Sequence, residues 1–209
     1  MADRSLAGLS VDDFLRRLAS GDPTPGGGSA SALGGALGAA LVSMVCNLTI
    51  GRERYADTEA EVTEIREAAQ SLLDRLRRGI DEDAEAYDRV IAAYRLPRGT
   101  DDDKAARSEA IQEATRLAAL APLGLVEASA EVIGLAERAL GKTNPHAVSD
   151  LAVAALFGVA SLDGAAANVE INLTSLKDEA ARDEIAARLA TARAGARERA
   201  SGVVERAQT

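Results

Sequence analysis

A run of glycines near the start of the chain has the composition of an anion-binding turn. The run is Pro25-Gly26-Gly27-Gly28-Ser29. A helix that begins at this run presents free backbone N–H groups at the positive end of its dipole. The run is neither a Walker loop, because the Gly-Lys-Ser/Thr end is missing, nor a dinucleotide fingerprint, because no strand precedes it. A tight turn that only glycine fits against a neighbouring helix explains it equally well.

Polar residues also recur on one side of an apolar segment later in the chain. Asp150 and Asn168 are 18 residues apart, which is five helical turns, so a helix places them on one face with Ser161 between them. Asn172 follows one turn later. Polar side chains on an apolar helix must hydrogen-bond to neighbouring helices or to a ligand. The spacing therefore predicts a buried polar network or a ligand-binding stripe.

A third candidate is the pair Asp83 and Tyr87, which are one helical turn apart. Asp83 belongs to the acidic run 81–83, whose simplest interpretation is a solvated face. If the site is partly buried, like-charge crowding raises the pKa of a carboxyl group there, which suits a general acid or base.

These residues belong to motifs that occur in a fixed order along nearly the whole chain. The motifs are Asp22-Pro-Thr-Pro-Gly-Gly-Gly-Ser-Ala-Ser-Ala-Leu33, Asn47-Leu-Thr-Ile-Gly-Arg52 with Tyr55, Asp83-Ala-Glu-Ala-Tyr87 leading to Leu96-Pro97, and Asn144-Pro-His-Ala-Val-Ser-Asp150 leading to Asn168-Val-Glu-Ile-Asn172. Together they resemble the formiminotetrahydrofolate cyclodeaminase/methenyltetrahydrofolate cyclohydrolase family. The resemblance implies an all-helical homodimer that acts on folate one-carbon derivatives. Bifunctional relatives carry a fused formiminotransferase, which this sequence lacks, so the chain resembles the cyclohydrolase branch more.

The resemblance implies hydrolysis of 5,10-methenyltetrahydrofolate to 10-formyltetrahydrofolate. The methenyl carbon is a cationic amidinium, so the reaction needs a positioned water, a base that takes its proton and an acid that assists departure of N5. We expect Asp83 or Asp150 to be the base, and Asn168 and Asn172 to orient the pterin or the water. We expect Tyr87 to form a stacking or hydrogen-bonding wall.

The remaining binding residues implied by the resemblance surround the substrate's other end. Arg52, Lys142 and the N–H groups of the glycine run are expected to hold the glutamate tail, and Asn144 joins the binding residues. No metal, redox group or other cofactor is required by this chemistry. His146 and Cys46 are the chain's only histidine and cysteine, so a zinc site of the usual His/Cys type cannot be assembled within one subunit.

Two other functions are compatible with the same residues. Cyclodeamination of 5-formiminotetrahydrofolate, in which N10 attacks the formimino carbon and ammonia leaves, also passes through a tetrahedral carbon between N5 and N10. The sequence does not separate it from hydrolysis. A non-enzymatic helical dimer that binds folate or a partner protein is the third possibility.

The elements that must position these residues are all predicted to be helices. A capping pattern at Ser10 starts a first helix that ends near Ala19. Further helices are expected at 29–51, 57–94, 101–140, 144–173 and 177–207, with a kink at Pro122. Residues 29–51 carry no charge and are rich in glycine and alanine. The prediction is an all-α, single-domain bundle of about six helices over residues 1–209, with a buried small-residue central helix.

Composition narrows the class of protein further. Aromatic residues make up 2% of the chain and hydrophobic residues 47%, so the core consists mostly of alanine, leucine, valine and isoleucine. Such a core offers little apolar area per residue, so its stability requires many contacts or a partner subunit, which favours oligomerisation. The net charge of −9 has the wrong sign for binding nucleic acid. No signal peptide is visible and a membrane span is not favoured, because aromatic belts and flanking cationic clusters are missing. We expect a cytoplasmic protein.

Overall fold

The computed structural model describes residues 5–208, and within this range every regular element is a helix. The α-helices are α1 (Val11–Leu18), α2 (Gly27–Asn47), α3 (Glu59–Tyr94), α4 (Asp101–Ala139), α5 (Val148–Leu173), α6 (Glu179–Arg193) and α7 (Ala196–Ala207). Three short 3-10 helices are η1 (Leu6–Gly8), η2 (Glu53–Thr58) and η3 (Pro145–Ala147). The all-α prediction is confirmed. Residues 1–4 and 209 of the expected domain lie outside the described range.

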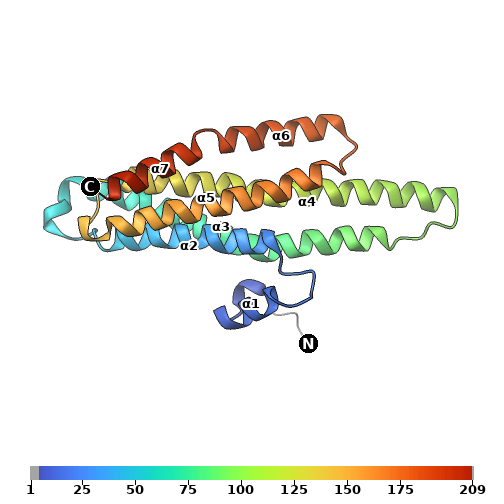
Figure 1. The fold of residues 1–209 in the computed structure, drawn as a ribbon, viewed down its shortest axis with the longest axis horizontal. Coiled ribbons are helices and arrows are strands. Elements are labelled where there is room, and N and C mark those ends of the chain that lie inside the picture. Colours follow the sequence, from blue (N-terminus) through green and yellow to red (C-terminus); the bar gives the residue numbers. More distant parts are fainter. Residues whose placement is uncertain (1–4, 209) are drawn as a thin grey trace.

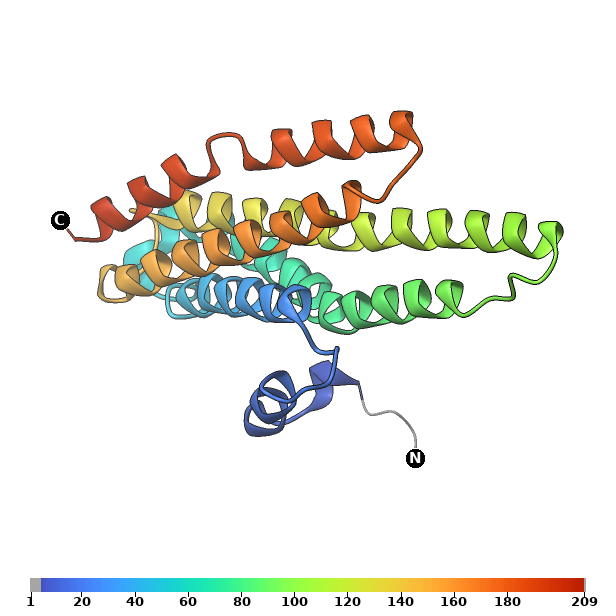
Figure 2. The same ribbon diagram turned by 45° about the vertical axis from the view of Figure 1, so that its right-hand side comes forward.

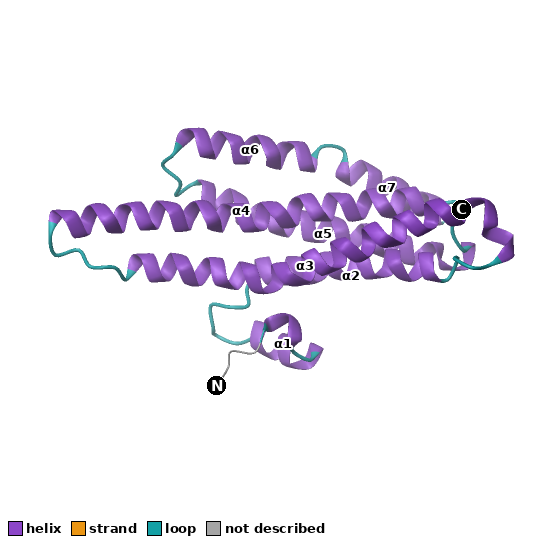
Figure 3. Cartoon of the chain, turned by 180° about the vertical axis from the view of Figure 1, so that it is seen from behind, coloured by secondary structure: helices purple, strands orange, loops and turns teal. Residues whose placement is uncertain are grey.

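Helices α2 to α5 form an up-and-down four-helix bundle (Figure 1). Each packs against the next along the chain, and α5 returns to lie beside α2. Helices α6 and α7 run along the outside of α4 and α5, whereas α1 stands off the bundle near the start of α2 (Figure 2). The view from behind shows α3 and α4 extending beyond the other helices at one end (Figure 3).

Capping residues fix several helix starts. The Ser10 hydroxyl accepts a hydrogen bond from the Asp13 N–H, as its capping pattern predicts. Thr100 and Asp103 form a complete capping box ahead of α4. Each of these bonds satisfies a backbone group that the first helical turn leaves without a partner.

Two predicted boundaries are corrected by the structure. The helix expected over residues 177–207 is divided into α6 and α7, because Gly195 adopts a left-handed conformation with φ of 67° that ends the first helix. The bundle therefore has one more α-helix than expected. Helix α2 begins at Gly27 rather than Ser29, and it ends at Asn47, ahead of the left-handed Gly51.

Helix α2 is the small-residue helix at the centre of the bundle. A Cβ atom added at Gly38 would lie 2.9 Å from the carbonyl oxygen of Ala154, and one added at Gly35 would lie 2.8 Å from the Ser161 hydroxyl oxygen. Only glycine permits this close approach to α5. Cys46 is buried on the same helix, and desolvation raises the pKa of its thiol to about 11.

The central helix is not buried all round, although its uncharged sequence suggested that it would be. Its outer side leaves Leu37, Met44 and Leu48 exposed. By length and composition alone, three helices are long and apolar enough to cross a membrane, and they lie within Gly27–Asn47, Asp101–Ala139 and Pro145–Leu173. Much of each apolar segment packs inside the bundle.

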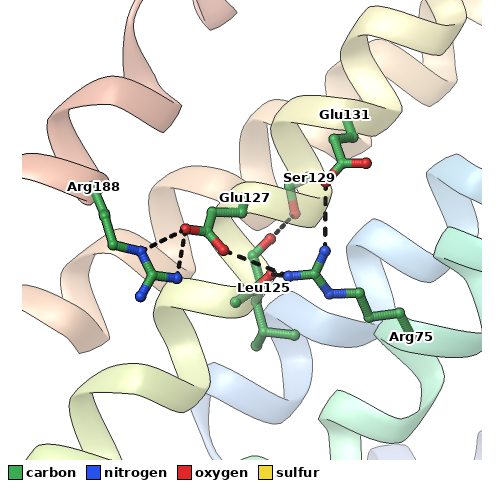
Figure 4. Close-up of polar contacts among 7 residues, drawn as sticks. Arg75, Leu125, Glu127, Ser129, Glu131 and Arg188 are labelled. Atoms are coloured by element: carbon green, nitrogen blue, oxygen red, sulfur yellow. Dashed lines mark hydrogen bonds and ion pairs between the residues drawn. The ribbon is translucent and has the colours of Figure 1, made fainter. Parts of the chain in front are cut away.

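Charged side chains connect helices α3, α4 and α6 to one another (Figure 4). Arg188 of α6 donates two hydrogen bonds to one Glu127 oxygen on α4, at 2.8 and 3.1 Å. Arg75 of α3 lies 3.6 Å from the other Glu127 oxygen and 3.4 Å from Glu131. This network joins three helices by ion pairs, in contrast to the glycine contacts between α2 and α5.

Candidate functional site

Several of the residues predicted to do chemistry meet in a cavity at the start of α2. The cavity has a volume of about 360 Å³ and lies between the glycine run, α3 and the C-terminal half of α5. It is lined by Pro23, Thr24, Gly26, Gly27, Gly28, Asp83, Ala86, Tyr87, Val90, Ala118, Asn168, Ile171 and Asn172. The structure therefore brings together residues more than 140 positions apart in the sequence.

Asp83 is fixed by the first turn of α2. Its Oδ2 atom accepts a hydrogen bond of 2.9 Å from the Ser29 N–H, one of the amides that a helix start leaves free. The Ser29 hydroxyl lies 3.3 Å from the same oxygen and 2.9 Å from the Ile80 carbonyl oxygen, so its single proton serves one acceptor at a time. Oδ1 makes no hydrogen bond within residues 5–208 and remains the oxygen that a bound water can use.

The glycine run has a steric reason as well as an electrostatic one. A Cβ atom added at Gly28 would overlap the Asp83 carboxylate, whereas one added at Gly27 would lie an ordinary 3.7 Å from Asn168 Nδ2. Gly28 therefore lets the carboxylate approach the helix start. The two explanations of the glycine run, tight packing and an anion site, hold together, and the anion is the chain's own carboxylate.

The pKa of Asp83 is raised above its usual value by the desolvation that accompanies burial. The hydrogen bonds from the Ser29 hydroxyl and N–H act in the opposite direction and lower the pKa, but they do not cancel the effect of burial. The sequence suggested a raised pKa from like-charge crowding in the run 81–83. The direction is confirmed, and the cause is burial.

Asp81 is not among the groups that shift the pKa of Asp83, and it has a structural role. It accepts hydrogen bonds from the Ser5 hydroxyl and the Leu6 N–H. This contact anchors the N-terminal segment on α3, and the loop that continues from α1 supplies Pro23 and Thr24 to the cavity wall.

Two asparagines of α5 form the opposite wall. Asn172 Nδ2 donates to the Ala118 carbonyl oxygen on α4 and to the Asn168 carbonyl oxygen, at 2.9 and 2.8 Å. Asn168 Nδ2 donates to the Gly164 carbonyl oxygen at 2.8 Å. Neither side-chain oxygen accepts a hydrogen bond within the described residues, so both can accept one from a ligand N–H or a water. Tyr87 is 41% exposed and completes the wall from α3.

The other predicted site residues are not part of this cavity within one chain. Asp150 lies in the first turn of α5, about 27 Å from Asn168 at 1.5 Å per residue. Lys142 forms an ion pair of 2.6 Å with Glu61. The 18-residue spacing placed Asp150 and Asn168 on one face, but it also separates them along the helix.

Asn144 and Arg52 lie at the Asp150 end as well. The Asn144 side-chain oxygen accepts hydrogen bonds from the Arg54 side chain and from the His146 backbone N–H. The backbone N–H of Asn144 donates to the Thr49 hydroxyl. Arg52 is exposed where α2 passes into η2. The single site expected from the sequence is thus two groups of residues at opposite ends of the bundle.

Two further residues of the polar stripe and the glycine run are structural. Ser161 is buried and its hydroxyl lies 2.7 Å from that of Ser129, so it belongs to a satisfied polar network. Pro25 is buried beside the cavity without lining it.

Sequence reasoning missed the apolar part of the wall, which is formed by Ala86, Val90, Ala118 and Ile171. Such residues have no chemical signature of their own, although Val90 and Ile171 lie about one helical turn from Tyr87 and Asn168. Within residues 5–208, no three His, Cys, Asp or Glu side chains are grouped so as to hold a metal ion.

Comparisons with known proteins identify the family of the chain. The sequence model of the formiminotransferase-cyclodeaminase family matches residues 10–191. The chain belongs to the formiminotransferase-cyclodeaminase family. Within it, the chain is 47% identical over 175 residues to a methenyltetrahydrofolate cyclohydrolase of Methylorubrum extorquens, covering 84% of each chain.

Other members of the family are more distant. The chain is 32% identical over 204 residues to the formimidoyltransferase-cyclodeaminase of Sus scrofa, a match that covers 98% of this chain and 38% of that protein. A crystal structure of a formiminotetrahydrofolate cyclodeaminase from Thermotoga maritima has the same fold, with a TM-score of 0.81 and 28% identity over 96% of this chain and 94% of that one.

Proposed function

We propose that the chain hydrolyses 5,10-methenyltetrahydrofolate to 10-formyltetrahydrofolate. The observation that carries the proposal is the Asp83 carboxylate, which faces a cavity of ligand size while the Ser29 N–H holds one of its oxygens. The 47% identity to a methenyltetrahydrofolate cyclohydrolase supports this reaction among those of the family.

The Asp83 carboxylate suits a cationic substrate, and it acts at the step in which water attacks the methenyl carbon. Asp83 Oδ1 accepts a proton as the water oxygen bonds to the methenyl carbon, which gives a neutral tetrahedral carbon between N5 and N10. Asp83 then returns a proton to N5 as the carbon–N5 bond breaks. The hydroxyl on that carbon loses its proton to solvent and becomes the formyl oxygen, so the net reaction consumes one water and releases one proton. A raised pKa helps the return of the proton.

The other cavity residues bind and orient the substrate in this proposal. The side-chain oxygens of Asn168 and Asn172 accept hydrogen bonds from the pterin ring or from the water, and Tyr87 packs against the ring. None of the steps calls on a metal or a redox cofactor.

A second activity, cyclodeamination of 5-formiminotetrahydrofolate, is favoured by the likeness to the Thermotoga maritima cyclodeaminase structure. The same carboxylate can protonate the leaving ammonia, because that reaction also passes through a tetrahedral carbon between N5 and N10.

Purified protein incubated with each substrate separates the two activities. Hydrolysis predicts a faster loss of the methenyl absorbance and formation of the 10-formyl product without ammonia. Ammonia release with rising methenyl absorbance from the formimino substrate supports cyclodeamination. Because the methenyl compound also hydrolyses in buffer, Asp83→Asn is the control. Equal rates for buffer, the wild type and Asp83→Asn contradict the proposal.

We also propose that the protein is a cytoplasmic homodimer. An alanine-rich core and the exposed apolar side of α2 support association with a second copy. Sedimentation at several protein concentrations tests it, and a single monomeric species at micromolar concentration contradicts it.

A further inference from the structure

The Asp83 cavity lacks one thing that a folate needs. A folate carries carboxylates on its glutamate tail, but among residues 5–208 no lysine or arginine lines the cavity. The cationic residues predicted for the tail, Arg52 and Lys142, lie at the other end of the bundle, and so does Asp150. A separation of about 27 Å along α5 excludes direct cooperation within one chain.

Between these two ends of the bundle, α2 and the outer stripe of α5 form a surface, and neither contributes a charged side chain to it. The apolar residues along it are exposed or partly exposed, and they are Leu33, Leu37, Ala40, Leu41, Met44 and Leu48 from α2 and Val153, Leu156, Ala160, Ala167 and Ile171 from α5. On α5, Asp163 and Glu170 pair with arginines of α6 and α7. Arg197 and Glu205 of α7 line a hollow beside Leu156 at the edge of this surface. We refer to these apolar residues of α2 and α5 as the α2–α5 face.

The α2–α5 face is large enough for a stable dimer. Helix α2 has 21 residues and is about 30 Å long, and two helices side by side are about 20 Å wide. The face therefore offers about 600 Å² per copy, or about 1,200 Å² in total, which reaches the range of specific interfaces. The absence of charge is typical of the centre of such interfaces.

Contacts between α2 and α5 define the register of the two helices. Gly27 lies against Asn168, Ser31 against Gly164, Gly35 against Ser161 and Gly38 against Phe157. Leu37 is the midpoint of α2, and it therefore lies beside residues 157–159 of α5. Residue 159 is also midway between Asp150 and Asn168. A two-fold axis that lies in the plane of the face, passes near Leu37 and residue 159 and crosses both helices at right angles therefore brings one end of the face opposite the other end in a second copy.

We infer that a second copy of the chain packs antiparallel on the α2–α5 face about this axis, and that each Asp83 cavity is completed by Asp150 and Arg52 of the partner subunit. The inference rests on the proposed function. The axis brings the partner's Asp150 opposite Asn168, at the cavity wall. It also brings the C-terminal end of the partner's α2 opposite the start of α2 at the cavity. The partner's Arg52, which follows that end, thereby supplies the missing cation beside the acidic segment around Asp83.

Mixing two inactive variants tests the shared site directly. Asp83→Asn and Asp150→Asn are each expected to be dimeric, folded and strongly impaired. When the two are unfolded together and refolded, half of the dimers carry one copy of each, and one of their two sites has both carboxylates. The mixture is expected to recover about one quarter of the wild-type rate, as two-fold symmetry dictates. A site confined to one chain recovers nothing, and a fully active Asp150→Asn variant also contradicts the inference.

Charged substitutions on the face test the partner independently of activity. Leu156 is 55% exposed in the single chain, so Leu156→Glu is expected to fold, to sediment as a monomer and to lose turnover at least tenfold. Leu96→Glu is the matched control, because Leu96 is 40% exposed just after the C-terminal end of α3, away from the α2–α5 face, and it is expected to remain dimeric and active.

The remaining outcomes separate this inference from the proposed function and from a membrane. If the wild type turns over the substrate but Leu156→Glu stays dimeric, the face is not the interface and the function stands. If the wild type is a monomer that binds neutral phosphatidylcholine vesicles, and Leu156→Glu releases it, the face contacts lipid and the inference is wrong. An inactive wild type that is nevertheless dimeric through this face argues against the function alone.

Discussion

Asp83 and Lys142, at opposite ends of the bundle, are held in different ways. Asp83 is partly buried and bound by a backbone N–H at the start of α2, and burial raises its pKa. Lys142 is bound by another flexible side chain, Glu61, and both side chains of this ion pair are more than a third exposed. A backbone donor in a helix is already in place before a ligand arrives, whereas an exposed ion pair rearranges easily.

The difference indicates a division of labour between the two ends. Rigid, partly dehydrated donors suit proton transfer, because the proton affinity of the carboxyl group is set by its surroundings. A solvent-screened lysine suits a flexible ligand tail, because it exchanges one carboxylate for another at little cost. Substitutions at the Asp83 end are therefore expected to have large effects on catalysis, and those at the Lys142 end small effects on stability.

The largest expected effect is that of Asp83→Asn on turnover. Loss of a general base is expected to lower kcat about 10²- to 10⁴-fold, measured with saturating methenyl substrate. The fold is not expected to suffer. Because burial raises the pKa of Asp83 above 3.8, the folded state favours the protonated form, and this contribution to stability is present below pH 3.8 and lost as pH rises through the folded pKa.

The sign of that linkage provides the check on Asp83→Asn. At neutral pH the variant is expected to be at least as stable as the wild type in denaturant unfolding, and the advantage is expected to shrink in acid. A variant that loses activity together with cooperative unfolding would show that Asp83 holds the bundle together rather than transferring protons.

Gly28→Ala is expected to have the next largest effect, because the added methyl group overlaps the Asp83 carboxylate. Overpacking of this kind costs about 1–3 kcal/mol of unfolding free energy, and displacing the carboxylate by about 1 Å is expected to lower kcat about 10²-fold. Gly27→Ala is the matched control, because its methyl group meets only an ordinary contact. Equal activities of the two variants would contradict the steric role of Gly28.

The helices could be predicted from the sequence more completely than the site. Hydrophobic periodicity and the cap at Ser10 predicted the helices, since these signals are local. The division at Gly195 was missed, because a glycine in a helical pattern is ambiguous until its φ angle is known.

The site depends on packing that no local pattern contains. The pairing of Ser29 with Asp83 joins residues 54 positions apart, and the sequence named both residues without indicating that they meet. The same reasoning assigned Asp150 and Asn168 to one site, because it used the angle around α5 and neglected the distance along it.

Ser29→Ala sharpens the comparison by removing one donor from Asp83 and leaving the other. The Ser29 hydroxyl lowers the pKa of Asp83, so its loss is expected to raise that pKa further. If Asp83 acts as a base, the acidic limb of the kcat profile moves to higher pH, with about a tenfold loss of rate in acid for a net hydrogen bond of about 1.4 kcal/mol. Ser29→Thr, which retains the hydroxyl, is the control. An unchanged profile would assign the limb to another group.

Lys142→Gln is expected to have the smallest effect on the fold. Its ion pair with Glu61 is short but partly exposed, and such pairs contribute about 0–1 kcal/mol, less in high salt. Denaturant unfolding at low and high salt should therefore give nearly equal stabilities for the variant and the wild type. If Lys142 binds the glutamate tail, the KM rises while kcat is unchanged, because a distant cation contributes uniform binding. A loss of stability well above 1 kcal/mol would mean that both ends of the bundle hold their charges structurally, and the division of labour would not stand.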